Sequence, residues 1–167
     1  STVHIGIDPG EKGAAAAVTE SGITVCSLSD GEENTWAWLS QFLGVENCCA
    51  AIEKQTPRPT WLEKQQKSTV LASTCILYGN YRSARAMLLC ASIPFEDVSP
   101  KRWQKAVGMI HGKGESYKDW KNRLKERAAE LFPQVKVTLG NADALLLAKY
   151  CQKMSGYSPG FSLRKTP

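Results

Sequence analysis

The sequence lacks the features that are typical of membrane-spanning proteins, secreted proteins and proteins with a structural zinc site. It has no run of about 18 apolar residues, so we expect no membrane-spanning helix. It opens on a strand-like apolar stretch, so we expect no secretion signal. Its six cysteines include no C-x-x-C pair, and most lie in apolar runs, so we expect reduced core residues rather than a disulfide framework or a zinc site. The expected location is therefore cytoplasmic.

Internal repeats, low-complexity blocks and dividing linkers are also missing. The 167 residues, of which 43% are hydrophobic and 22% charged, suit one folded domain with a substantial core. We expect that domain to span residues 1–155. Residues 156–167, which carry Ser, Pro and Gly, are expected to form a flexible tail.

What the chain does have is a concentrated positive charge. Residues 101–130 contain nine basic and four acidic residues, whereas the rest of the chain has twelve of each, so this stretch accounts for the whole net charge of +5. Trp103, Tyr117 and Trp120 lie in the same stretch, and aromatic residues among basic ones are typical of a polyanion-binding surface. The alternative is an ordinary solvated helix face.

Hydrophobic periodicity predicts an α/β fold. Residues 3–7, 13–18 and 23–28 form three expected antiparallel strands, and Pro9-Gly10 supplies the first turn. Two more strands are expected at 48–52 and 93–98, with helices at 35–43, 67–90, 99–107, 116–132 and 141–154. Gly79 is a candidate break in the second helix. The antiparallel start and the later alternation predict a mixed sheet with helices on both faces.

Three carboxylates occupy unusual positions. Asp8 ends the first strand, Glu53 ends the fourth, and Asp143 lies early in the last helix. If the first and fourth strands are neighbours, Asp8 and Glu53 meet at one end of the sheet, and the last helix can bring Asp143 to them. The structural alternatives are a turn cap for Asp8, a surface position for Glu53 and a dipole-compensating helix acid for Asp143.

A shared location for these acids predicts a metal site. Clustered carboxylates raise one another's pKa, and a divalent cation removes the conflict. Oxygen ligands select hard ions, so Mg²⁺ or Mn²⁺ is expected. Two such ions can activate a water and stabilise the leaving oxygen of a phosphodiester, and we expect two ions per site.

Four motifs follow one another along the chain: Ile5-Gly6-Ile7-Asp8-Pro9-Gly10, Ile52-Glu53-Lys54-Gln55, Val98-Ser99-Pro100-Lys101-Arg102-Trp103-Gln104-Lys105 and Ala142-Asp143-Ala144-Leu145. In order and spacing they resemble the RuvC-type Holliday junction resolvases over nearly the whole chain. The helix at 118–132, which ends in Ala-Ala-Glu-Leu-Phe-Pro, is similar to the plastid and phage branches of that family. The resemblance implies an RNase H-like fold, a homodimer and metal-dependent paired nicking of a four-way DNA junction, in a bacterial, phage-infected or organellar setting.

The resemblance also implies residue roles. Asp8, Glu53 and Asp143 become catalytic metal ligands, and Lys118 becomes the candidate for holding the scissile phosphate, with Lys113 as its competitor. The family usually places a fourth ligand, Asp or His, shortly before the last acid. Residues 138–142 contain neither, and Asn141 offers only an amide oxygen.

The expected DNA interface follows the basic residues, because phosphate contacts position a protein on DNA. The candidate lysines are Lys101, Lys105, Lys113, Lys118, Lys121 and Lys125. Trp61 or Pro59, just after Glu53, is a candidate wedge between unstacked bases, and the alternative is that Trp61 packs on the following helix.

The helix at 69–90 is rich in small residues and is the candidate for the dimer contact or for close approach to DNA at Gly79. In the second case Tyr78, Tyr81 and Arg82 would face phosphates.

The sequence suggests three other functions, of which two remain open. A related RNase H-like nuclease acting on RNA or flap DNA would use the same acids, and a non-catalytic junction-binding protein would account for the missing ligand. An actin-like nucleotide kinase shares the Gly6–Gly10 pattern, but the chain is too short for two lobes and has no second phosphate loop, so no nucleotide cofactor is expected.

Overall fold

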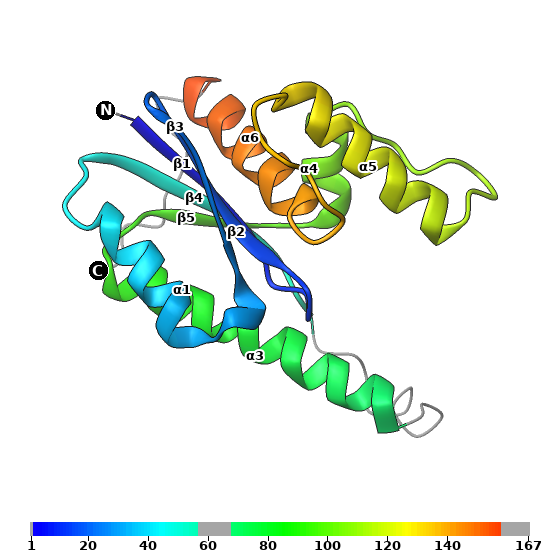
Figure 1. Cartoon of the computed structure of the whole chain (residues 1–167), viewed down its shortest axis with the longest axis horizontal. Coiled ribbons are helices and arrows are strands. Elements are labelled where there is room, and N and C mark those ends of the chain that lie inside the picture. Colours follow the sequence, from blue (N-terminus) through cyan, green and yellow to red (C-terminus); the bar gives the residue numbers. More distant parts are fainter. Residues whose placement is uncertain (1, 57–67, 158–167) are drawn as a thin grey trace.

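A mixed sheet organises the part of the chain that the structure describes. The computed structural model describes residues 2–56 and 68–157. Its strands are β1 (Thr2–Asp8), β2 (Ala14–Thr19), β3 (Gly22–Ser27), β4 (Asn47–Glu53) and β5 (Phe95–Val98). They lie in the order β3-β2-β1-β4-β5, with antiparallel pairing from β3 to β1 and parallel pairing from β1 through β4 to β5 (Figure 1). The predicted mixed sheet is confirmed.

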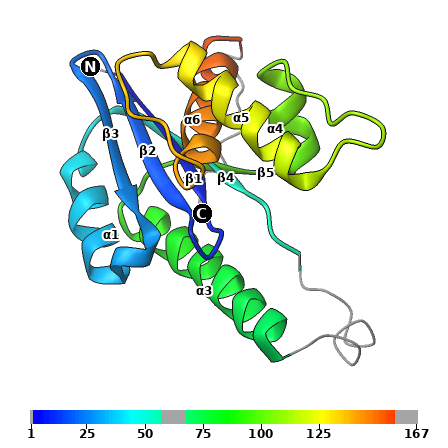
Figure 2. The same cartoon turned by 45° about the vertical axis from the view of Figure 1, so that its right-hand side comes forward.

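Helices cover both faces of this sheet, as predicted (Figures 1 and 2). On one face lie α1 (Glu32–Leu39) and α3 (Ser68–Cys90), with the short 3₁₀ turns η1 (Leu28–Asp30) and η2 (Ser40–Phe42). The other face carries α4 (Pro100–Ala106), α5 (Tyr117–Leu131) and α6 (Ala142–Tyr157). Among the helices described, none has the length and hydropathy of a membrane span.

The alternation of side chains along the strands separates the two cores. Val3, Ile5 and Ile7 of β1 pack toward α1 and α3, so His4, Gly6 and Asp8 point toward α6. In β4 the residues Cys49 and Ala51 belong to the α6 core, which places Glu53 on the same side. Both strand-end acids therefore project into the layer formed by α4, α5 and α6.

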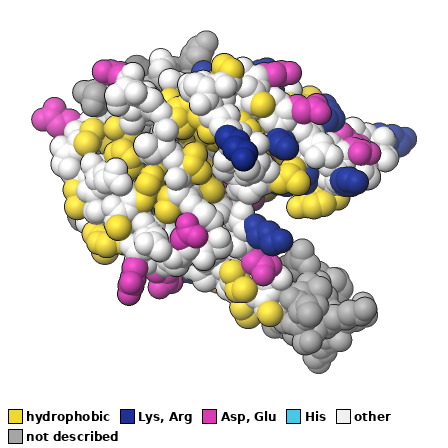
Figure 3. All heavy atoms as spheres, in the orientation of Figure 1, with side chains coloured by type: hydrophobic (Ala, Val, Ile, Leu, Met, Phe, Trp, Pro, Cys, Tyr) yellow, Lys and Arg dark blue, Asp and Glu magenta, His cyan; other side chains and the backbone are white. Residues whose placement is uncertain are grey.

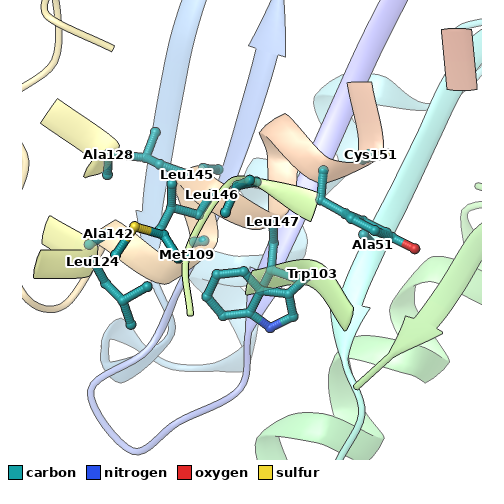
Figure 4. Close-up of a cluster of buried hydrophobic side chains, with 14 of the residues drawn as sticks. Ala51, Trp103, Met109, Leu124, Ala128, Ala142, Leu145, Leu146, Leu147 and Cys151 are labelled. Carbon is teal, nitrogen blue, oxygen red and sulfur yellow. The ribbon is translucent and has the colours of Figure 1, made fainter. Parts of the chain in front are cut away.

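The core beneath α6 is dense. Leu145, Leu146 and Leu147 of α6 are fully buried, because the helix is surrounded by the sheet, α4 and α5. Trp103 of α4 is also fully buried and lies in this cluster (Figure 4). Close packing of this kind fixes where the first turn of α6 lies relative to the ends of β1 and β4.

Some sequence expectations need correction. The strand expected at 93–98 begins only at Phe95, after Ser92 with a φ of 54° and Pro94. The candidate break at Gly79 is absent, because α3 continues through this residue. Cys75 and Cys90 are exposed rather than core residues, since only one side of α3 packs on the sheet.

Candidate active site

Strand pairing brings the first two acids together. Strands β1 and β4 are parallel neighbours in the register Ile7↔Ile52, so Asp8 and Glu53 are the next residues at the same sheet edge. The carboxyl ends of adjacent parallel strands are a frequent location for ligand sites. The sequence prediction that the two acids lie side by side at one end of the sheet agrees with this register.

A glycine brings the third acid to the same place. Helix α6 crosses β1 so closely at Gly6 that a Cβ there would lie 2.1 Å from the carbonyl oxygen of Ala144 and 2.2 Å from the amide nitrogen of Ala148. Only glycine permits this contact. The first turn of α6 is thereby held over the end of β1, and Asp143 in that turn is 7% exposed.

The pKa values show that the three carboxylates interact. Burial, and then the charges of Asp8 and Asp143, raise the pKa of Glu53 to about 7 against an opposing hydrogen bond from Trp103. Burial and the charge of Asp143 raise the pKa of Asp8 to about 6, although the amide of Gly10 and the charge of Lys121 act in the opposite direction. Desolvation and like charge both disfavour ionised carboxyl groups, so the cluster is electrostatically frustrated.

Hydrogen bonds fix the two strand-end acids. The indole Nε1 of Trp103 donates to Oε2 of Glu53 at 2.8 Å, and Nε2 of Gln55 donates to Oε1 at 3.1 Å. The amide of Gly10 donates to Oδ1 of Asp8 at 3.0 Å, which ties the Pro9-Gly10 turn to the carboxylate. Trp103 therefore positions Glu53 from within the core, although the sequence had suggested it for a DNA-facing surface.

Lys121 is the lysine that the structure brings to the acids. Its Nζ forms an ion pair with Oδ2 of Asp143, and the lysine side chain is 21% exposed. Burial lowers the pKa of Lys121, but the charge and hydrogen bond of Asp143 outweigh it and raise the pKa above its ordinary value. Lys118, the lysine chosen from the resemblance, is exposed one turn earlier on α5.

The residues present fit a hard divalent cation in their chemistry. Oδ1 of Asp143 is buried and has no hydrogen-bond partner among residues 2–56 and 68–157. Asp8 and Glu53, whose pKa values burial and the neighbouring carboxylates raise, supply with Asp143 the oxygen donors that Mg²⁺ or Mn²⁺ prefers. In the described part of the chain no three His, Cys, Asp or Glu side chains already stand in the arrangement of a metal site. Binding would therefore require side-chain adjustment, above all around the Lys121–Asp143 pair.

Asn141, whose amide oxygen could substitute weakly for a fourth ligand, is hydrogen-bonded at both ends of its amide. Its Oδ1 accepts from the amide of Thr138 at 2.8 Å, and its Nδ2 donates to the carbonyl of Lys136 at 3.1 Å. Both ends of the amide are thus used to hold the loop that leads into α6.

Ion pairs divide the nine basic residues of the 101–130 stretch into two groups. Arg102, Lys121, Arg123 and Arg127 each pair with an acid. The others form no ion pair within the described residues: Lys101, Lys105, Lys113, Lys118 and Lys125. Figure 3 shows Lys and Arg side chains gathered on the half of the molecule that carries α4, α5 and the loop between them. Five of the six lysines expected at DNA thus keep their charge unpaired.

The aromatic residues of this stretch are mostly internal. Trp103 and Trp120 are buried, at 0% and 6% exposure, and only Tyr117 at 76% is available to a ligand. The earlier interpretation of all three as a polyanion surface was wrong for the two tryptophans, because their helices turn them toward α6. The sequence pattern of aromatic and basic residues does not distinguish an aromatic side chain that faces the core from one that faces solvent.

The residues expected to contact DNA from α3 differ in their surroundings. Arg82 is exposed, as a phosphate contact requires. Tyr81 is buried, and its hydroxyl donates to Oδ1 of Asp97 at 2.6 Å, so its expected contact with phosphate is wrong. Trp61 and Pro59 lie outside the described residues.

These observations define the class of fold as RNase H-like. The chain is similar to Thermus thermophilus RuvC in complex with a Holliday junction substrate, with 15% identity, a TM-score of 0.57, and coverage of 93% of this chain and 97% of that chain. A second Thermus thermophilus RuvC structure has 15% identity, a TM-score of 0.50, and coverage of 92% and 97%. No family model and no curated protein matches the sequence. The predicted RuvC-like fold is confirmed by these structures.

Proposed function

We propose that the chain is a metal-dependent endonuclease that resolves four-way DNA junctions by paired nicking as a homodimer. The observation that supports this most is the convergence of Asp8, Glu53 and Asp143 at one sheet edge of a RuvC-like fold. A cluster of buried acids destabilises the protein unless a bound cation compensates it, so its presence favours a metal-dependent activity.

In this proposal Asp8, Glu53 and Asp143 hold Mg²⁺ or Mn²⁺. When bound, such ions supply the Lewis-acid chemistry that phosphodiester hydrolysis requires. Trp103 keeps one oxygen of Glu53 in a fixed direction through its 2.8 Å hydrogen bond. The rigid core around Trp103 therefore limits the positions that the Glu53 carboxylate can adopt.

Besides forming its ion pair with Asp143, Lys121 has a role in the proposed reaction. Its ammonium group lies against Asp143, inside the acid cluster, where a substrate phosphate would add further negative charge. A lysine in that position favours phosphate entry and neutralises charge that develops during cleavage. We assign this role to Lys121, and Lys118 with Lys113 remains a candidate for contacting the adjacent phosphates from the exposed side.

The exposed lysines Lys101, Lys105, Lys113 and Lys118, together with the half-buried Lys125, would hold the DNA arms through their phosphates. Arg82 would contribute from α3. Because these residues read charge and shape rather than base edges, the proposed specificity is for branched structure.

The outer face of α3 is the proposed dimer contact. The exposed residues that the structure describes on this helix are Ala72, Cys75, Ile76, Gly79, Arg82, Ala86, Leu89 and Cys90. Arg82 is the charged residue among these eight. Ile76 and Leu89 are 44% and 48% exposed, and a helix face of small and apolar residues allows close helix packing. Because a Cβ at Gly79 would meet no atom within 4 Å, Gly79→Arg should leave the monomer folded and abolish the dimer in sedimentation experiments.

Cleavage assays test the proposed activity directly. Wild type with Mg²⁺ or Mn²⁺ should nick a four-way junction and leave linear duplex and RNA intact. Asp8→Asn should bind the junction without nicking it, whereas the exposed control Asp119→Asn should nick normally. Undiminished nicking by Asp8→Asn would refute the proposal, and preferred cleavage of RNA or flap DNA would favour the related nuclease.

A non-catalytic junction-binding protein is the second candidate. The absence of a fourth acidic ligand and the use of Asn141 as a loop-fixing residue favour it. Tight junction binding by wild type without any nicks in Mn²⁺ would select this function.

A further inference from the structure

A basic pocket lies apart from the acid cluster, where the end of α4 meets α5 and α6. The pocket is open to the surface and has a volume of about 230 Å³. Four basic side chains line it: Lys105, Arg127, Lys149 and Lys153. The rest of the lining consists of Ala106, Val107, Gly108 and Leu131. No acidic residue is among the described residues that line it.

Two of the four cations are held in place by the backbone. Nε of Arg127 donates to the carbonyl of Val107 at 3.0 Å, and Nζ of Lys153 donates to the carbonyl of Ala106 at 2.9 Å. Both carbonyls lie at the end of α4, where cations are favoured. The remaining N–H groups of these side chains are thereby kept at the pocket at little further entropic cost.

Few partners neutralise the pocket. Arg127 also pairs with Glu130, but that carboxylate is 67% exposed, and exposed ion pairs contribute little. Nζ of Lys149 donates to Oε1 of Gln152 at 3.1 Å, a neutral group. Lys105 has no acidic partner among the residues that the structure describes. Four lining cations, with Glu130 as the one acidic partner that the described residues provide, give the pocket a net positive charge.

The size and chemistry of the pocket suit a phosphate group. A volume of about 230 Å³ far exceeds the roughly 15 Å³ that one water needs. The guanidinium fork of Arg127 matches the geometry of phosphate oxygens, and lysines add point charges around it.

Its position relates it to the acid cluster. Helices α5 and α6 pack side by side (Figures 1 and 2). Lys121 forms its ion pair with Asp143 near the start of both helices. Arg127 lies six residues after Lys121, and Lys149 lies six residues after Asp143. Six residues of helix span roughly 9 Å, which is the axial rise of about three nucleotides of one DNA strand.

We propose that this pocket is a second anion site that binds a phosphate group. In the context of the proposed junction cleavage, and resting on it, the group is a backbone phosphate about three nucleotides along the DNA arm from the cleaved position. The same chemistry is shared by free phosphate, so the experiments separate the two sources.

Binding of inorganic phosphate tests the pocket itself. Lys149→Gln and Lys105→Gln remove the two cations that do not hold α4, so the fold should be retained, and unchanged thermal unfolding would verify it. We expect saturable phosphate binding by wild type in calorimetry, at least a tenfold loss in both variants and no change in the exposed control Lys136→Gln. Absent binding by wild type, or equal binding by Lys149→Gln, would overturn the proposal.

The salt dependence of DNA binding tests the source of the phosphate. Each pocket variant should reduce the slope of log K against log salt for a four-way junction by about one, whereas Lys136→Gln should not. Lost phosphate binding with an unchanged slope would overturn the DNA assignment and support a site for free phosphate. Neither result depends on cleavage, so failure of the proposed nuclease activity would be seen separately.

Discussion

Neutralising Glu53 should stabilise the metal-free protein. Glu53→Gln keeps the shape of the side chain and removes one charge from the acid cluster. The new amide oxygen still accepts from Nε1 of Trp103, and Gln55 can turn its own amide to receive the new N–H group. The substitution therefore tests electrostatics with little change in packing or hydrogen bonding.

The expected size follows from the pKa of Glu53. A folded-state value of about 7, against an ordinary 4.5, corresponds to roughly 3 kcal/mol of destabilisation above pH 8. Because the folded state binds the extra proton, this cost is absent below about pH 4.5 and grows as the pH rises toward 7. Glu53→Gln should raise the melting temperature at pH 8 by roughly 6–12 °C for a chain of this length.

Thermal unfolding in EDTA at pH 5 and pH 8 measures this effect. The gain should be large at pH 8 and small at pH 5, and Glu33→Gln on the exposed side of α1 should show neither. Added Mn²⁺ should then stabilise wild type more than the variant, because the ion needs the carboxylate. A variant that is less stable than wild type at pH 8 would refute the electrostatic reasoning.

Three further substitutions probe the surroundings of the acids. Lys121→Gln should tighten Mn²⁺ binding in calorimetry and lower the cleavage rate, because it removes a competing cation that the reaction uses; weaker Mn²⁺ binding would contradict this. Trp103→Phe loses the hydrogen bond that lowers the pKa of Glu53, so the pH profile of cleavage should move to higher pH, and an unmoved profile would contradict the positioning role. Gly6→Ala forces its Cβ against the backbone of α6 and should cost roughly 1–3 kcal/mol or more in urea unfolding, whereas no loss would contradict the close helix contact.

Much of the fold was accessible from periodicity and turn residues. The apolar runs that end at Asp8 and Glu53 predicted β1 and β4 because a strand buried on both faces requires a continuous apolar sequence. Pro9-Gly10 located the first turn, and the Ser99-Pro100 start located α4. Element boundaries were less accurate, as at β5, where local backbone conformation around Ser92 and Pro94 decides the start.

The candidate site was predictable only in its acids. Their positions at strand ends and at a helix start indicated a common location, which the register of β1 and β4 and the contact at Gly6 explain. Lys121 and Trp103 were not predicted to lie at the acids, because their orientation depends on how α4 and α5 pack on α6. The four-residue spacing of Trp120, Leu124 and Ala128 was the available signal, since it defines the buried face of α5 beside which Lys121 lies.

The composition likewise does not reveal which basic residues form ion pairs. A count of basic residues cannot distinguish Lys105 from Arg123, whose guanidinium is paired with Glu115 at 2.9 Å. Partners far apart in sequence, such as Lys121 and Asp143, form only through the tertiary fold. The net charge therefore indicated an anionic partner, but the residues that face it depend on the structure.

Anomalous diffraction from crystals soaked in Mn²⁺ tests the central claim most directly. An ion peak bound by oxygens of Asp8, Glu53 and Asp143 is the predicted result, with the unpartnered Oδ1 of Asp143 among the ligands. A map without any peak at these three carboxylates, at Mn²⁺ concentrations that saturate other nucleases, would contradict the account.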